Sequence, residues 1–265
     1  MRRLTLPLII LASVALAAAL AWLTLSRASF GDRSPRAEAA TVRTVPPFTR
    51  LDVAGTAEVT LVQGAAESVS IAASPRKQGR IDADVRDGTL HIESTDRSRW
   101  WHVFVGSAAS SRPPQIVVTF KDLDSIATAG TIKLVATDVN VANLKVSGAG
   151  GTSVKIDNLV AGQLRLSGTG ATRAELAGRV TDQTVTISGA GEYRGGRLVS
   201  QNATVTVAGA AQVVVNAEKT LKATISGAGS VEYFGDPQVT ERISGAGRVR
   251  RRDASSGIAQ VAIAE

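Results

Sequence analysis

Two pairs of aspartates are the residues of this chain whose spacing could support catalysis. Asp82 and Asp84 are two positions apart, as are Asp122 and Asp124, so each pair shares one face of an extended segment. Paired carboxylates in a groove of a β-helix can act on polysaccharides, sometimes with calcium. Both pairs also border predicted turns, where aspartate commonly bonds the local backbone. Structural or solvated carboxylates are therefore the first interpretation, and a polysaccharide lyase or hydrolase is the alternative.

Other patterns of catalytic or metal-binding residues are missing from the sequence. The chain has no cysteine and only two histidines, His91 and His102, which excludes a thiol nucleophile, a cysteine zinc site and a three-histidine metal centre. No Gly-x-Ser-x-Gly motif accompanies His91. Asp138 and Asp157 fall in equivalent predicted turns and could stack around a cation, although no calcium-binding nonapeptide repeat supports this. We expect no enzymatic activity, no cofactor and no metal site.

Two clusters are candidates for ligand binding. Trp100, Trp101 and Phe104 concentrate aromatic rings that could stack on sugars, although sealing of the open end or side of the fold is the first interpretation. The basic cluster near the C-terminus includes Arg250, Arg251 and Arg252, which could meet phospholipid headgroups or lipopolysaccharide phosphates. A charged cap that prevents edge-to-edge association of the final coil is the first interpretation of this cluster, and ligand binding is the alternative.

Composition and charge restrict the class of protein. The chain has 265 residues, 25 glycines and only 4% aromatic residues, so its core must rest on Val, Ile, Leu and Ala. Of the net charge of +7, residues 1–39 contribute +3 through five arginines and two acids, which leaves +4 for the remainder. This modest excess argues against a dedicated nucleic-acid binder.

A glycine-rich repeat is the strongest signal in the sequence. Ser-Gly-Ala-Gly occurs at 147–150, 188–191, 226–229 and 244–247, with related motifs between these copies. No copy continues as a dinucleotide-binding motif, and no amphipathic helix follows one. The repeat therefore predicts structural corners, where glycine accepts positive φ and allows close stacking of the backbone. The predicted corners, 18 to 21 residues apart from the second onward, are Gly55, Gly130, Gly148, Gly168, Gly189, Gly209, Gly227 and Gly245.

Short strands with alternating apolar and polar residues flank the motifs, as in Leu144-Lys145-Val146 and Val205-Thr206-Val207. A unit of 18–21 residues with two or three short strands predicts an all-β parallel β-helix, or β-solenoid, over residues 45–252. Residues 45–125 are expected to form less regular coils of the same kind, with a hairpin at Asp87-Gly88. Residues 253–265 are expected to be a flexible tail.

The N-terminus predicts export. Residues 4–25 are uncharged, follow Arg2-Arg3, and would span roughly 33 Å as a helix, enough to cross a bilayer core. The length of this hydrophobic helix favours an uncleaved signal-anchor in the inner membrane, whereas Ala37-Glu38-Ala39 offers a cleavage site for a secretory signal. Residues 26–44 are expected to be a linker. Both alternatives place the remainder in the periplasm or at the cell surface.

The combined pattern resembles the putative autotransporter adhesin head GIN domain family, an exported bacterial domain of unknown function. The resemblance rests on the opening from Phe48 to Gly64, the hairpin Asp87-Gly88-Thr89-Leu90-His91-Ile92, the Ser-Gly-Ala-Gly ladder, and the segment from Val231 to Pro237. It implies a right-handed parallel β-helix outside the inner membrane, with a role in adhesion, and it transfers no functional residues. We therefore expect a non-enzymatic envelope scaffold or binding module whose partners are envelope glycans or another envelope protein.

Overall fold

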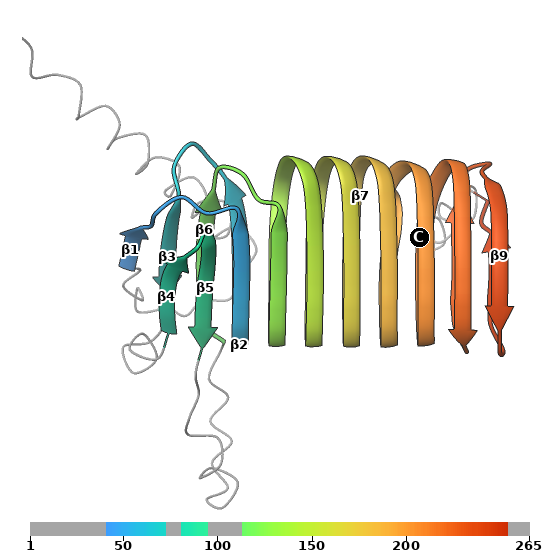
Figure 1. Ribbon diagram of the computed structural model, residues 1–265, viewed down its shortest axis with the longest axis horizontal. Helices are drawn as coiled ribbons and strands as arrows, with labels where there is room; N and C mark the ends of the chain where they lie inside the picture. Colours follow the sequence, from blue (N-terminus) through green and yellow to red (C-terminus); the bar gives the residue numbers. More distant parts are fainter. Residues whose placement is uncertain (1–40, 73–80, 95–112, 254–265) are drawn as a thin grey trace, which may run out of the picture. The chain divides into compact units, whose positions relative to one another are not determined.

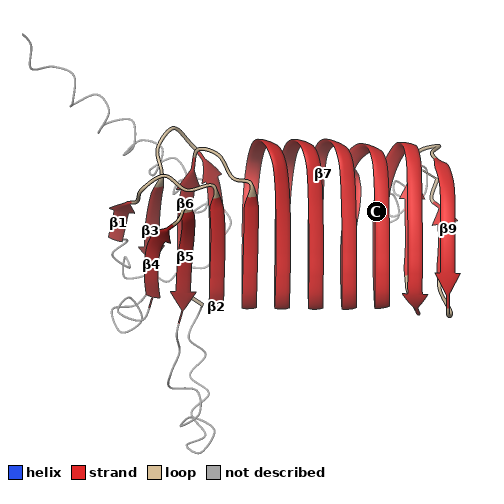
Figure 2. Ribbon diagram, viewed as in Figure 1, coloured by secondary structure: helices blue, strands red, loops and turns tan. Residues whose placement is uncertain are grey.

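The computed structural model describes residues 41–72, 81–94 and 113–253, and within these ranges every regular element is a β-strand (Figures 1 and 2). The strands are β1 (Thr41–Thr44), β2 (Arg50–Gln63), β3 (Ser68–Ala72), β4 (Ile81–Arg86), β5 (Thr89–Ser94), β6 (Gln115–Phe120), β7 (Ser125–Gly227), β8 (Ser230–Phe234), β9 (Gln238–Ser244) and β10 (Arg248–Arg251). β1 lies inside the range that the sequence predicted as a linker.

All ten strands belong to one mixed sheet, in which β2 joins the N-terminal strands to β7. On one edge, β2 pairs in parallel with β5 along residues 50–55 and with β6 along residues 58–63. On its other edge it pairs in parallel with residues 125–136 of β7. Three pairs are antiparallel: β1 with β3, β3 with β6, and β4 with β5.

This mixed sheet corrects the prediction of a right-handed parallel β-helix over residues 45–252, which is wrong. The physical reason is partly local. The turn at Asp87-Gly88 has positive φ at both residues, 50° and 69°, and this reverses the chain so that β4 and β5 must run antiparallel. The hairpin itself is confirmed. The predicted N-terminal hydrophobic helix at residues 4–25 falls outside the described residues, and among those that are described no helix is long and apolar enough to cross a membrane.

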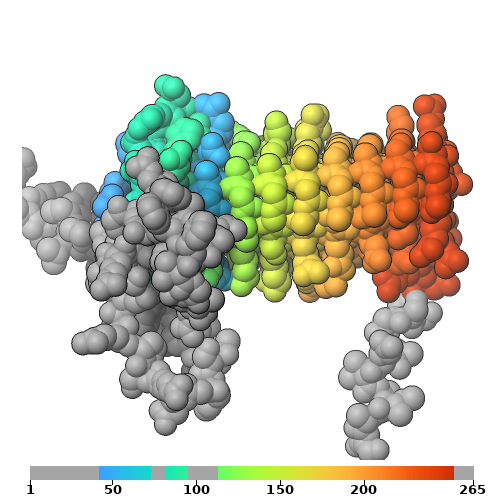
Figure 3. All heavy atoms as spheres, turned by 90° about the horizontal axis from the view of Figure 1, so that it is seen from below, coloured from blue at the N-terminus to red at the C-terminus, as the bar shows by residue number. Residues whose placement is uncertain are grey.

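β7 is one long strand element that winds repeatedly in the same direction, and its successive passes lie side by side (Figures 1 and 3). We call one such turn of the chain a winding. Apolar side chains at alternate positions point inward from each pass: Leu144 and Val146 are buried, as are Val205 and Val207. Burial of such a side chain contributes about 1.5–3 kcal/mol, so the aliphatic columns stabilise the windings without large aromatic residues.

A column of glycines marks one corner of the windings. Each member has φ between 98° and 126°, and from the second onward a Cβ atom would collide with the carbonyl group of the glycine before it. A side chain at these positions would therefore strain the backbone and separate neighbouring windings. The column consists of Gly55, Gly130, Gly150, Gly170, Gly189, Gly209, Gly227 and Gly245.

Two predicted corners, Gly148 and Gly168, are not in this column, and Gly150 and Gly170 take their places. A Cβ atom on Gly148 would meet the side chain of Thr152, at 2.9 Å from its hydroxyl oxygen. Gly168 stands in the same relation to Thr172. These two glycines therefore make room for buried threonines just after the corner, and the second glycine of each motif forms the corner itself.

Candidate ligand-binding site

The candidate site is a pocket of about 290 Å³, open to solvent on the outer surface of the windings. It combines three guanidinium groups, one carboxylate and an apolar floor. We call it the arginine groove, and define it by Glu175, Arg194, Gly196, Arg197, Val214, Phe234 and Arg252.

The winding period brings these residues together from distant parts of the sequence. Arg194, Val214, Phe234 and Arg252 follow one another at intervals of 20, 20 and 18 residues. Phe234 of β8 is in register with Asn216 of β7, and the amide of Arg252 donates to the carbonyl oxygen of Tyr233 at 2.8 Å. The groove therefore runs across neighbouring passes, perpendicular to the strands.

Gly196 keeps the groove open. A Cβ atom at this position would lie 2.9 Å from Cε2 of Phe234 and 3.4 Å from Cγ1 of Val214. The missing side chain thus leaves a hollow between the arginines of one pass and the phenylalanine two passes further on. Because the φ of Gly196 is not in the left-handed region, space is what favours glycine here.

A buried hydrogen-bond network holds the backbone beneath the groove. The hydroxyl of Tyr193 donates to Oε1 of Gln183 at 3.0 Å, and Nε2 of Gln183 donates to Oγ of Ser200 at 2.7 Å. Nδ2 of Asn216 donates to the carbonyl oxygen of Gly196 at 3.3 Å. Burial raises the pKa of Tyr193, so its phenol stays protonated as a donor. These bonds fix the segment that carries Arg194 and Arg197.

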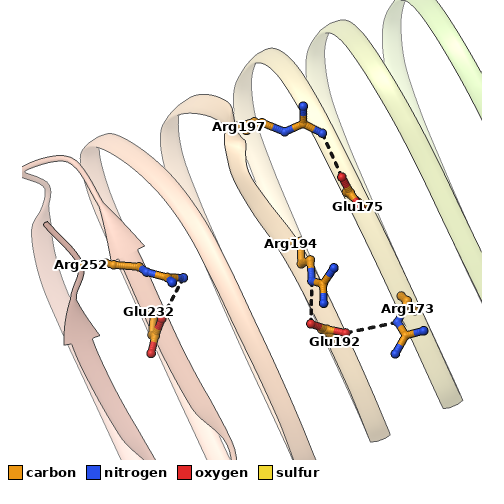
Figure 4. Close-up of polar contacts among 7 residues, drawn as sticks. All are labelled: Arg173, Glu175, Glu192, Arg194, Arg197, Glu232 and Arg252. Carbon is orange, nitrogen blue, oxygen red and sulfur yellow. Dashed lines mark hydrogen bonds and ion pairs between the residues drawn. The ribbon is translucent and has the colours of Figure 1, made fainter. Parts of the chain in front are cut away.

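At one end of the groove, Arg194 is oriented by a glutamate. Nε of Arg194 lies 2.6 Å from Glu192, and Nε of Arg173 lies 3.2 Å from the other oxygen of the same carboxylate (Figure 4). The hydrogen bond from Arg194, together with Arg173, lowers the pKa of Glu192. Glu192 therefore remains ionised and restrains two guanidinium groups.

The other two arginines of the groove are held in a similar way. Arg197 contacts Glu175 at 2.9 Å, and Arg252 contacts Glu232 at 3.2 Å (Figure 4). The guanidinium of Arg252 also lies 5.8 Å from the ring centroid of Phe234, within the range of a cation–π contact. The side chains of Arg197 and Arg252 are 65% and 47% exposed, so a ligand in solution can reach them.

The chemistry of the groove is anion binding. Its lining carries three arginines against one glutamate, an excess of two positive charges. Each guanidinium has five N–H donors, so pairing with a glutamate leaves donors for a second anion. The guanidinium group of arginine does not lose its proton near neutral pH, so arginines suit ligand recognition rather than acid–base catalysis.

The predicted basic cluster contributes one residue to this groove. Arg252 lines it, whereas Arg250 is in register with Glu232 on β8, and Arg251 forms an ion pair with Asp236 at 2.9 Å. The other predicted ligand-binding residues, Trp100, Trp101 and Phe104, lie outside the described residues.

The predicted carboxylate pairs lie elsewhere, and none of the four lines the groove. Asp84 forms an ion pair with Arg86 at 2.7 Å, and Asp82 is exposed opposite Glu93 on β5. Asp122 accepts a hydrogen bond from the amide of Leu123 at 2.9 Å, a local turn contact. The backbone of Asp124 bonds to Thr49.

Asp138 and Asp157 do not bond to each other. Asp138 accepts a hydrogen bond from Asn158 at 2.9 Å, and Asp157 pairs with Lys155 at 3.3 Å. Across the described ranges, no three His, Asp or Glu side chains come together in a group suited to a metal ion.

Sequence reasoning missed Glu175, Arg194, Arg197, Val214 and Phe234. The winding period was the signal that could have found part of the set, since positions 18–20 residues apart stack on neighbouring passes. The period of 18 residues links Phe234 to Arg252, whereas Val214 is in register with Glu232, two positions along the strand from Phe234. It does not reveal the hollow at Gly196, which depends on packing.

Comparison with known proteins gives one family and several similar folds. The family model described as putative auto-transporter adhesin, head GIN domain, matches residues 47–237. A putative adhesin from Bacteroides fragilis has a TM-score of 0.70 at 18% identity, over 84% of this chain and all of that one. A putative lipid binding protein from Parabacteroides distasonis has a TM-score of 0.61 at 19% identity, over 81% and 96%. A putative adhesin from Parabacteroides merdae has a TM-score of 0.56 at 18% identity, with the same coverage. No curated protein sequence matches the chain.

Proposed function

Since the chain belongs to the family of putative auto-transporter adhesin, head GIN domain proteins, we propose that it is a non-enzymatic binding module of the cell envelope. It acts outside the cytoplasmic membrane, as the uncharged segment 4–25 predicts. Its ligand site is the arginine groove, and its ligand is anionic.

The observation that carries this proposal is the convergence of Arg194, Arg197 and Arg252 around one open pocket. Each is oriented by a glutamate, which lowers the entropy lost when the guanidinium engages a ligand. A catalytic site would need a titratable pair at the pocket, and Glu175 is its only acidic or histidine lining residue. These features favour binding over catalysis.

The experiment compares three forms of the full chain: the natural protein, the double variant Arg194→Ala/Arg197→Ala, and Arg165→Ala as a control. Arg165 is an exposed arginine of the same strand, β7, and lies outside the groove. Each is tested against immobilised acidic polysaccharides, neutral polysaccharides and anionic vesicles at physiological salt. We expect the natural protein and the control to retain an anionic ligand that the double variant loses. Equal retention by all three, or no retention of any anionic ligand, would contradict the proposal.

A further inference from the structure

We infer that the ligand of the arginine groove is a linear acidic polysaccharide, bound with its chain running across the windings and a carboxylate at each end of the bound segment. The inference rests on the proposed function and adds the class and orientation of the ligand.

The orientation follows from where the charges lie. Arg194 and Arg197 stand on one pass of the windings, and Arg252 stands three passes further on, after those of Val214 and Phe234. Neighbouring strands are about 4.8 Å apart, so the backbones at the two ends are separated by roughly 14 Å. A single phosphate or a monosaccharide cannot reach both ends. An extended ligand with anionic groups some distance apart can.

The floor between the cations suits a sugar ring. Phe234 and Val214 are half-buried and present apolar surface where Gly196 leaves the hollow. The face of an aromatic ring carries partial negative charge and packs well against the C–H groups of a pyranose. One strand spacing is comparable to one pyranose unit of a linear chain, so successive sugars can follow successive passes. The fork of each arginine then matches a uronate carboxylate in a bidentate way.

A membrane surface fits this face less well. Arg173, Arg194, Arg197 and Arg252 are interspersed with Glu175, Glu192 and Glu232 (Figure 4), so these seven residues together carry an excess of only one positive charge. A bilayer responds to the charge of the whole face, and each basic residue near it adds only about 1 kcal/mol. A polymer segment inside the groove instead meets the guanidinium groups individually.

The test measures calorimetric binding of oligogalacturonates of two to six residues to the full chain. Affinity should rise with length until the oligomer spans both ends, at about four residues, and then level off. Oligomers whose carboxyl groups have been reduced to alcohols should bind poorly. Arg252→Ala should weaken the long oligomers roughly 10- to 100-fold, the loss expected for a charged hydrogen bond, and leave the shortest ones unchanged. Arg165→Ala should have no effect.

A second variant probes the hollow. Gly196→Ala places a methyl group against Phe234 and should weaken the long oligomers while leaving the circular dichroism spectrum unchanged. Suppose that inorganic phosphate or anionic vesicles bind through the groove, and that the affinity for oligogalacturonates does not depend on their length. This result would overturn the polysaccharide inference and leave the proposed function standing. Equal affinity for the carboxyl-reduced oligomers would also overturn it. Failure of every anionic probe to bind would overturn both.

Discussion

Replacing Gly150 with alanine tests whether the glycine column holds the windings together. Gly150 has a φ of 98°, and a Cβ atom there would lie 2.7 Å from the carbonyl oxygen of Gly130 on the preceding winding. The adjacent residue, Gly151, is a matched control. Its φ is not in the left-handed region, and its Cβ atom would find its nearest neighbour at 3.7 Å, an ordinary contact.

The expected loss can be worked out from these contacts. An L-residue in the left-handed region is strained by roughly 1–3 kcal/mol. Relief of the contact also requires the Gly130 carbonyl to move, which costs about 1 kcal/mol, comparable to one weakened hydrogen bond. The two effects give about 2–4 kcal/mol for Gly150→Ala. Alanine also stabilises by about 0.4–1 kcal/mol through the unfolded chain, but this applies equally to Gly151→Ala and cancels in the comparison.

The assay is thermal and urea unfolding, followed by far-ultraviolet circular dichroism, of the natural protein and both variants. We expect Gly150→Ala to melt about 5–15 °C below Gly151→Ala, because each kcal/mol shifts the Tm by roughly 2–4 °C in a domain of this size. Equal Tm values for the two variants would refute the account of the column as a steric contact between windings.

Three further predictions address the buried threonines, the groove and the N-terminus. Thr172 has a buried hydroxyl without a hydrogen-bond partner in the described structure, so Thr172→Val should raise the urea midpoint of unfolding. The hydroxyls of Thr152 and Thr128 lie 3.1 Å apart and share a hydrogen bond, so Thr152→Val should lower that midpoint. Because the folded-state pKa of Glu192 is lowered from its usual 4.5, its contribution to stability is complete above that pH and is lost as the pH falls through the lowered value. Glu192→Gln should therefore flatten the acid limb of stability against pH, and an unchanged acid limb would count against its ion pairs. Residues 4–25 should remain attached in the native host, so the membrane fraction should give the mass of the intact chain, and a soluble form beginning at Ala40 would contradict this.

The local elements of the fold were predictable, but their pairing was only partly so. Alternation around Leu144 and Val205 predicted strands because inward and outward positions differ in polarity at every second residue. Asp87-Gly88 predicted a hairpin because both residues tolerate positive φ. The period between glycines says nothing of strand direction in the long interval between the first corner, Gly55, and the second, Gly130. The antiparallel pairing of β3 with β6 therefore could not be derived, and the predicted parallel β-helix was wrong.

The identity of the corner glycines depends on packing that a motif does not contain. Ser-Gly-Ala-Gly at 147–150 and at 188–191 have the same letters, yet the corner is Gly150 in the first and Gly189 in the second. The difference lies in which inward position must stay small. In the first motif Gly148 yields space to Thr152, whereas in the second a Cβ atom on Gly191 would meet the side chain of Ile187. Such a choice needs neighbouring side chains in three dimensions.

The candidate site was predictable only at its edge. Arg252 was identified because several arginines gather near the C-terminus, a signal that local sequence carries without any knowledge of the fold. The groove also depends on Phe234 and on the hollow at Gly196, neither of which differs locally from an ordinary strand residue. Two of the predicted candidates, Arg250 and Arg251, are in ion-pair or register contact with residues outside the groove.

The stacking of each corner glycine on the one before also sets the order in which the windings can fold. Gly227 rests on Gly209 and β8 pairs with residues 18 positions earlier, so a new winding needs only the last one as its template. Among the passes of β7, the long-range step is the first one, when residues 125–136 reach back to β2. Contacts of short sequence separation form quickly, and stacked units fold by propagation. A chain delivered across a membrane from its N-terminus can therefore fold as it emerges, one winding after another, without waiting for its C-terminal end.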